Sequence, residues 1–120
     1  MGKRARARAR KAPTASTTEY RAGDGNVLTL RGSMTPKTRA RYAALSDEQS
    51  SAATVEDQWH RKLEFLFERL AVRWVIAGVA TEKQAELLTR FRVASDEERR
   101  WIRETLREHL AEEFPDVEAP

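Results

Sequence analysis

Two short segments near the start of the chain alternate between apolar and polar residues. Residues 19–22 are Glu-Tyr-Arg-Ala, residues 27–31 are Val-Leu-Thr-Leu-Arg, and Gly-Asp-Gly-Asn lies between them. Successive side chains of a strand point to opposite faces, so Leu28 and Leu30 would share one face. Glycine, aspartate and asparagine are typical of the turns that join antiparallel strands. The pattern predicts a β-hairpin whose leucine face packs against the rest of the protein.

The longest apolar pattern lies in the middle of the chain. Large apolar residues recur there at spacings of three and four: Val55, Trp59, Leu63, Leu66, Phe67, Leu70 and Trp74. This spacing places them on one face of an α-helix. Thr54 can cap the start of such a helix and Gly78 can close its end. We therefore predict one helix over residues 55–77. Because Phe65 lies beside the stripe and widens the apolar surface, we expect this helix to be covered by other elements on more than one side.

Three further helices are predicted from their start signals. Thr35-Pro36 combines a capping residue with a proline at the first helical position, and a basic helix through Leu45 follows. Residues 81–84 (Thr-Glu-Lys-Gln) and 95–98 (Ser-Asp-Glu-Glu) both match the capping box, and predict helices that run to residues 92 and 113. The residues expected to face inward are Ala85, Leu88 and Phe91 in the first of these, and Ile102, Leu106, Leu110 and Phe114 in the second.

Together these elements predict a mainly α fold: a small helical bundle of three to four helices, preceded by a short β-hairpin and a disordered basic N-terminal arm. Residues 1–18 hold a charged block and a Pro/Thr/Ser/Ala linker with little to bury, so we expect them to be disordered. Residues 19–120 are expected to form a single helical domain. Within it, residues 46–54 lack an apolar stripe and are expected to be a surface connector.

The positive charge of the chain is concentrated at one end. Six of the 22 lysines and arginines lie within the first eleven residues, and they are Lys3, Arg4, Arg6, Arg8, Arg10 and Lys11. Removing these six leaves 16 cations against 19 acidic residues, so residues 12–120 carry a net charge of −3. Guanidinium groups bind phosphate. The arm is therefore either a non-specific, salt-sensitive nucleic-acid arm, or a tail that solubilises the chain or contacts an acidic protein surface.

The residue types that catalysis needs are few and scattered. His60 and His109 are the only histidines, and each lies beside an apolar stripe, as an ordinary boundary histidine does. The acidic residues of 96–113 alternate with arginines on what the pattern predicts to be a solvated face. The chain has no cysteine, and Gly23 and Gly25 precede a strand instead of a helix, unlike a phosphate-binding loop. We expect no catalytic residue, no metal and no cofactor, and hence not an enzyme.

The large aromatic residues are the other candidates for function. Their helical spacing is typical of a core. Three tryptophans are many for so small a domain, which makes one of them, or Phe65, a candidate anchor for a protein partner. The apolar run of residues 71–77 is interrupted by Arg73 and is too short to cross a bilayer, so we expect no membrane partner.

The layout of residues 19–120 resembles the small tail assembly chaperones of long-tailed phages and prophages of high-GC actinobacteria. The shared features are a strand after a Gly/Asp turn (residues 24–31), a basic helix that begins at Thr-Pro, a polar insert and an acidic-basic helical bundle. The composition, rich in arginine, alanine and glutamate and poor in lysine, is typical of the same source.

The resemblance implies a non-enzymatic protein of the host cytoplasm that binds the tape measure protein. Such proteins keep the long apolar helices of that client soluble until the tail tube protein polymerises, and often occur in a short form and a frameshift-extended form. The resemblance assigns client contact to the exposed side of the helix at residues 55–77, above all to Trp59, Phe65, Phe67 and Trp74. The alternative function is that of an accessory protein that binds nucleic acid through residues 3–11. The oligomeric state is not indicated by the sequence.

Overall fold

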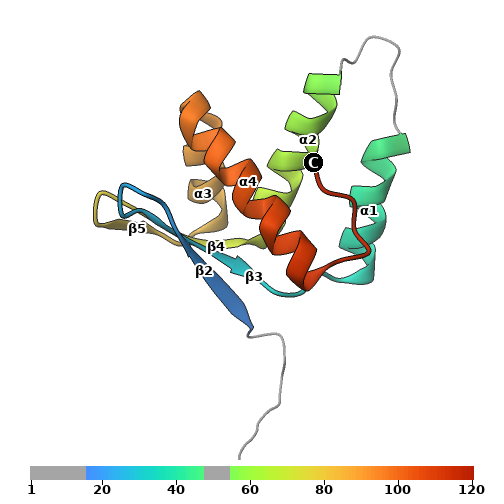
Figure 1. Ribbon diagram of the computed structural model, residues 1–120, viewed down its shortest axis with the longest axis horizontal. Helices are drawn as coiled ribbons and strands as arrows, with labels where there is room; N and C mark the ends of the chain where they lie inside the picture. Colours follow the sequence, from blue (N-terminus) through green and yellow to red (C-terminus); the bar gives the residue numbers. More distant parts are fainter. Residues whose placement is uncertain (1–15, 48–54) are drawn as a thin grey trace, which may run out of the picture.

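A computed structural model describes residues 16–47 and 55–120 of the chain (Figure 1). Within these residues it contains four helices and a four-stranded antiparallel sheet with the strand order β2-β3-β4-β5. The prediction of a mainly α bundle with a simple hairpin is therefore wrong, and the fold is mixed α/β. In chain order the elements are β2 (Thr17–Arg21), β3 (Val27–Arg31), α1 (Pro36–Asp47), α2 (Val55–Leu70), β4 (Ala71–Ile76), β5 (Val79–Thr81), α3 (Gln84–Arg92) and α4 (Asp96–Glu113).

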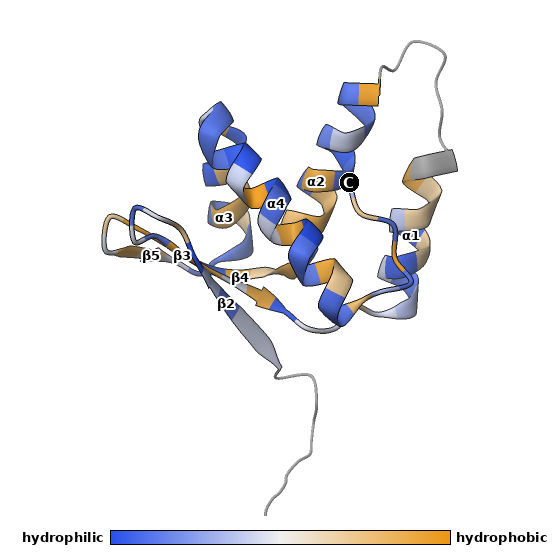
Figure 2. Ribbon diagram, in the orientation of Figure 1, coloured by the Kyte–Doolittle hydropathy of each residue, from blue (hydrophilic) through white to orange (hydrophobic). Residues whose placement is uncertain are grey.

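The core lies between the sheet and the helices α2, α3 and α4, and α1 packs beside α2 (Figure 1). Figure 2 shows that the end of α2 next to the sheet is mainly apolar, whereas its first turns after Val55 are mainly hydrophilic. Val55 itself is 81% exposed. The first half of α2 therefore extends beyond the core, and this is the part of the helix that forms the cleft described below. None of the helices in the described ranges is long and apolar enough to cross a membrane.

The predicted helix at residues 55–77 ends at Leu70, where the chain changes directly into strand β4. Trp74 is buried in both arrangements, since in the strand it pairs with Leu28 of β3 on the core face. The β-branched residues Val72, Val75 and Ile76 favour the extended conformation. Pairing with β3, which is distant in the sequence, adds the hydrogen bonds of a central strand. A spacing of four residues between Leu70 and Trp74 fits a helix, but the pairing of residues 71–75 with β3 favours the strand.

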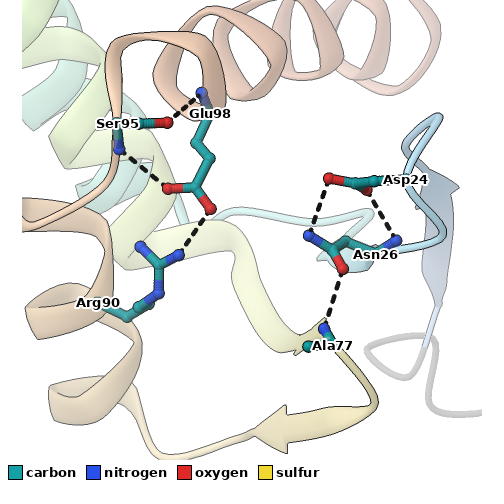
Figure 3. A network of polar contacts seen from close by, with 6 residues as sticks. All are labelled: Asp24, Asn26, Ala77, Arg90, Ser95 and Glu98. Atoms are coloured by element: carbon teal, nitrogen blue, oxygen red, sulfur yellow. Dashed lines mark hydrogen bonds and ion pairs between the residues drawn. The ribbon is translucent and has the colours of Figure 1, made fainter.

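Residues 77 and 78 form the turn of a second hairpin instead of the end of a helix. Ile76 pairs with Val79, so the loop between β4 and β5 has the two residues Ala77 and Gly78. Both have positive φ, +51° and +81°, as a type I′ turn requires. The Asn26 side-chain oxygen accepts a hydrogen bond from the Ala77 amide at 3.1 Å (Figure 3), and so ties this turn to the β2–β3 turn.

Replacing Ala77 by asparagine is expected to raise the free energy of unfolding by about 0.5–1 kcal/mol, because asparagine tolerates the left-handed conformation better than alanine. Equilibrium unfolding in urea measures the change. Gly78→Ala is the matched control and should lower the free energy of unfolding, since it adds a side chain at φ +81°. Equal stability of the two variants would contradict the turn geometry.

The predicted first hairpin and last helix are confirmed as local elements. β2 and β3 pair around the expected turn, with Leu28 and Leu30 fully buried, although β2 starts at Thr17, two residues earlier than expected. The Ser95 hydroxyl accepts from the Glu98 amide, and the Glu98 carboxylate accepts from the Ser95 amide, which completes the capping box of α4. The inward stripe of α4 is buried as predicted, at Ile102, Leu106, Leu110 and Phe114.

The start of α3 differs from its prediction. Thr81 belongs to strand β5, and the helix begins three residues later without a side-chain cap. This delay rotates the helix relative to the core, so Leu87 and Phe91 are buried while Ala85 is exposed and Leu88 is half-buried. At the start of α1, by contrast, the Thr35 hydroxyl accepts from the Thr38 amide as expected.

Two predicted segments lie largely outside the described residues. The basic arm and linker was assigned to residues 1–18, of which 16–18 are described, and Thr17 and Thr18 belong to β2. The predicted connector at residues 46–54 begins inside α1, which runs to Asp47, and its remainder is outside the described ranges. The six cations of the arm, which are Lys3, Arg4, Arg6, Arg8, Arg10 and Lys11, are all outside them as well.

Candidate partner-binding surface

Two of the four aromatic residues assigned to client contact lie in the core. Phe67 is 0% and Trp74 2% exposed. The Phe67 ring stacks on Phe91 at a centroid distance of 4.8 Å and meets Trp74 edge-on at 5.5 Å. Of the four residues, the structure therefore leaves only Trp59 and Phe65 partly exposed. Phe67 lies on the core face of α2, and Trp74 lies on the core face of β4, where it pairs with Leu28.

Phe65 is half-buried and faces α1. Its ring lies 6.0 Å from that of Tyr42, and the Arg69 guanidinium lies 5.1 Å from its centroid. Phe65 and Trp59 are six positions apart, which places them about 120° apart around the helix axis. They therefore belong to different sides of α2, and Phe65 is part of the contact between α1 and α2.

Trp59 lies at the edge of a cleft of about 290 Å³ between the first turns of α2 and α4. Its ring stacks on that of His60, with centroids 3.9 Å apart, and the guanidinium of Arg103 lies 4.2 Å from its centroid. Both contacts hold the half-buried indole in place. The residues that line the cleft are Glu56, Trp59, His60, Asp96, Arg99, Arg100 and Arg103.

The walls of this cleft, which we call the Trp59 cleft, are mainly cationic. Three arginines come from α4, and two carboxylates, one from each helix, accompany them. Arg99 is positioned by a hydrogen bond to the Arg92 carbonyl at 2.8 Å and lies over the Phe91 ring. Guanidinium groups bind carboxylates in a bidentate manner. Because His60 and Arg103 cover the faces of the half-buried Trp59 ring, its edge is the part that remains as an apolar contact. The cleft therefore offers an apolar contact surrounded by carboxylate-binding groups.

The chain after α4 turns back across the helices (Figure 1), and the surface of α1, α2 and α4 that it contacts is called the strap groove here. We call residues 115–120 the strap. The Asp116 carboxylate lies 3.0 Å from the Arg39 guanidinium of α1, and the Glu118 carboxylate lies 3.2 Å from the Lys62 ammonium of α2. The Tyr42 hydroxyl donates to the Glu118 carbonyl at 2.5 Å. Burial raises the pKa of Tyr42, with the charge of Glu118 as a further cause, so the hydroxyl keeps the proton that it donates.

The end of the strap reaches α4. The Pro120 carbonyl accepts from Arg107 at 2.9 Å and from Arg103 at 3.3 Å. Val117 and Ala119 pack against the core between these polar contacts. Since Arg103 also covers Trp59, the strap groove and the Trp59 cleft meet at this one side chain. The strap is absent from the elements predicted above, and its only signal in the sequence is the alternation of acidic and small apolar residues at 116–119.

His109 is fully buried and bridges α4 to both strands of the first hairpin. Its Nε2 lies 2.7 Å from the Arg31 carbonyl and its Nδ1 lies 2.8 Å from the Tyr20 hydroxyl. A carbonyl only accepts, so Nε2 carries the proton and Nδ1 accepts from Tyr20. Burial, aided by the charges of three glutamates of α4, raises the pKa of Tyr20 to about 12, which keeps its hydroxyl protonated. Both ring nitrogens therefore serve the fold, and His109 is a core residue instead of a boundary one.

A third concavity, of about 320 Å³, lies between the β2–β3 turn and the first turn of α4. Three of its polar residues already have partners: Asp24 accepts from Asn26, and Glu98 binds Arg90, outside the lining, at 2.6 Å (Figure 3). Burial acts to raise the pKa of Glu98, but the hydrogen bonds from Arg90 and Ser95 and the Arg90 charge lower it overall. Trp74 contributes an indole nitrogen that has no hydrogen-bond partner among the described residues.

No group of histidine and acidic residues within 16–47 and 55–120 is arranged to hold a metal ion. His60 instead stacks on Trp59 in the cleft wall. Comparison of the chain with protein-family models, with curated proteins and with solved structures found no match.

Proposed function

We propose that this chain is a non-enzymatic protein-binding module and acts as a tail assembly chaperone of a long-tailed phage or prophage, with the tape measure protein as its client. The observation that supports binding is the Trp59 cleft, where an indole lies among three arginines of α4. The layout resemblance of residues 19–120 supports the choice of client. The Trp59 cleft is part of the mixed α/β fold described above. The client surface that we propose is this cleft, which is smaller than the whole face of the helix predicted at residues 55–77.

The mechanism would be shielding of apolar side chains. A client helix places an apolar residue against Trp59, and its neighbouring carboxylates meet Arg99 and Arg100 at the walls of the cleft. The apolar residue is thereby removed from water until the client assembles. Because the contact needs only one apolar anchor with acidic neighbours, it covers many helices of similar composition with little specificity.

Co-expression with the tape measure protein tests this function. We expect the wild-type chain to keep the client soluble, and Trp59→Ala to lower the soluble fraction by about fivefold or more, as loss of an anchor residue does. Trp101→Ala is the matched control, because Trp101 is also half-buried but does not line the cleft. Deletion of residues 1–12 should have little effect.

Two outcomes would contradict the proposal. The first is full client solubility with Trp59→Ala, which would remove the cleft from the mechanism. The second is loss of function on deletion of residues 1–12 while Trp59→Ala remains active. In that case a gel shift of nucleic acid that disappears at raised salt would favour the nucleic-acid arm instead.

A further inference from the structure

We propose that the groove filled by the strap is a binding site for an acidic segment of a partner protein, which binds by displacing residues 115–120. This inference goes beyond the proposed function, since it concerns a second groove and a different recognition chemistry. It does not depend on the identity of the client.

The groove carries its own positive charge on three helices. Arg39 comes from α1, Lys62 from α2, and Arg103 and Arg107 from α4, and all four contact the strap. They surround a segment that contributes the carboxylates of Asp116 and Glu118. Acidic segments are therefore the ligands that this groove complements.

Three of these cations are held in place by aromatic rings as well as by the strap. The Arg39 guanidinium lies 5.3 Å from the Phe114 centroid, the Lys62 ammonium 5.9 Å from that of Tyr42, and Arg103 4.2 Å from that of Trp59. Cation–π contacts of this kind position the charges independently of the strap. The groove is thus largely formed before any acidic segment binds, which lowers the entropy cost of binding.

The strap lacks the regular backbone hydrogen bonding of the elements around it. Its residues form neither helix nor strand, and the acidic side chains of its two ion pairs are 73% and 72% exposed. Exposed ion pairs contribute little to stability. Val117 and Ala119 are only partly buried, so Pro120 is its one buried residue. Segments with few buried contacts open locally without unfolding of the core.

The contacts of the strap define the partner. The two carboxylates bind cations of different helices: Asp116 binds Arg39 of α1, and Glu118 binds Lys62 of α2. The intervening small apolar residues pack on the helices, and a backbone carbonyl meets Arg103 and Arg107. The partner segment therefore alternates acidic and small apolar residues. Because Arg103 joins the groove to the Trp59 cleft, a bound segment can continue into that cleft.

Fluorescence anisotropy with the whole chain tests the proposal. The probe is a labelled peptide with the sequence of residues 112–120, Glu-Glu-Phe-Pro-Asp-Val-Glu-Ala-Pro. We expect the variant Asp116→Asn/Glu118→Gln to bind this peptide about fivefold or more tightly than the wild type, because its own strap competes less well. A matched peptide with asparagine and glutamine in place of the same two acids should bind clearly more weakly. Adding Arg39→Gln and Lys62→Gln to the variant should return its affinity for the labelled peptide to the wild-type level or below.

Hydrogen exchange provides the second measurement. Binding of the peptide to the wild-type chain should speed exchange at the amides of residues 116–119 while α4 keeps its protection. Equal affinity of the wild type and the strap variant, equal affinity for both peptides, or a strap that stays protected in the complex would each overturn the proposal. A concentration-dependent dimer of the strap variant would assign the groove to a second copy and would also overturn it.

Discussion

Replacing Phe67 by alanine is expected to lower the free energy of unfolding by about 3–5 kcal/mol. The side chain is fully buried between two other rings, stacked on Phe91 and edge-on to Trp74. Its removal leaves a cavity at the junction of α2, β4 and α3, where the rings fix the angle between these elements. Urea unfolding followed by circular dichroism measures the loss. A domain of this size has little stability to spare, so the variant is expected to be largely unfolded at 37 °C.

Phe67→Leu is the control, with an expected cost of about 1.5 kcal/mol or less, since it keeps most of the apolar volume. The same series distinguishes the two roles that the sequence suggested for this residue. A Phe67→Ala variant that stays as stable as the wild type but no longer holds the client soluble would place Phe67 on the binding surface, and would contradict its position in the core.

The error at residues 55–77 has a definite physical origin. Leu70 and Trp74 are four positions apart, which suits one face of a helix, and a short apolar run does not distinguish helix from strand by its period alone. The strand forms because β3 is available as a partner, and that partner lies more than 40 residues earlier in the chain. Local patterns succeeded where the signal was local, as in the β2–β3 turn and the capping box at Ser95.

The candidate binding surfaces also combine features that local sequence patterns indicate with features that depend on residues distant in the sequence. Trp59 could be selected from the sequence as an anchor, because tryptophans were numerous. The arginines of α4 were assigned to a solvated face, and their approach to Trp59 depends on how α2 and α4 pack. The strap could not be predicted, because the alternation at residues 116–119 is too short to indicate an element and its partners are distant in the sequence. Asp116, for example, binds Arg39, which lies 77 positions earlier.

Replacing the fully buried His109 by phenylalanine is expected to lower the free energy of unfolding by about 2–4 kcal/mol, because the two hydrogen bonds of its ring are lost. The Arg31 carbonyl loses its donor at 2.7 Å and the Tyr20 hydroxyl loses its acceptor at 2.8 Å. Urea unfolding at neutral pH measures the cost. Substitution of a boundary histidine, the role that the sequence predicted, would change stability by less than about 0.5 kcal/mol.

Tyr20→Phe separates the two bonds, since it removes only the contact to Nδ1, with an expected cost of about 0.5–1.5 kcal/mol. In the His109→Phe background the same change should cost much less, because the bond is already absent. The pH dependence gives an independent check. The pKa of Tyr20 is 10.0 before folding and about 12 in the folded chain, so its contribution is complete below pH 10 and is lost as the pH rises toward 12. The advantage of the wild type over Tyr20→Phe should therefore shrink across that interval, and an advantage that grows there would show that burial does not favour the neutral hydroxyl.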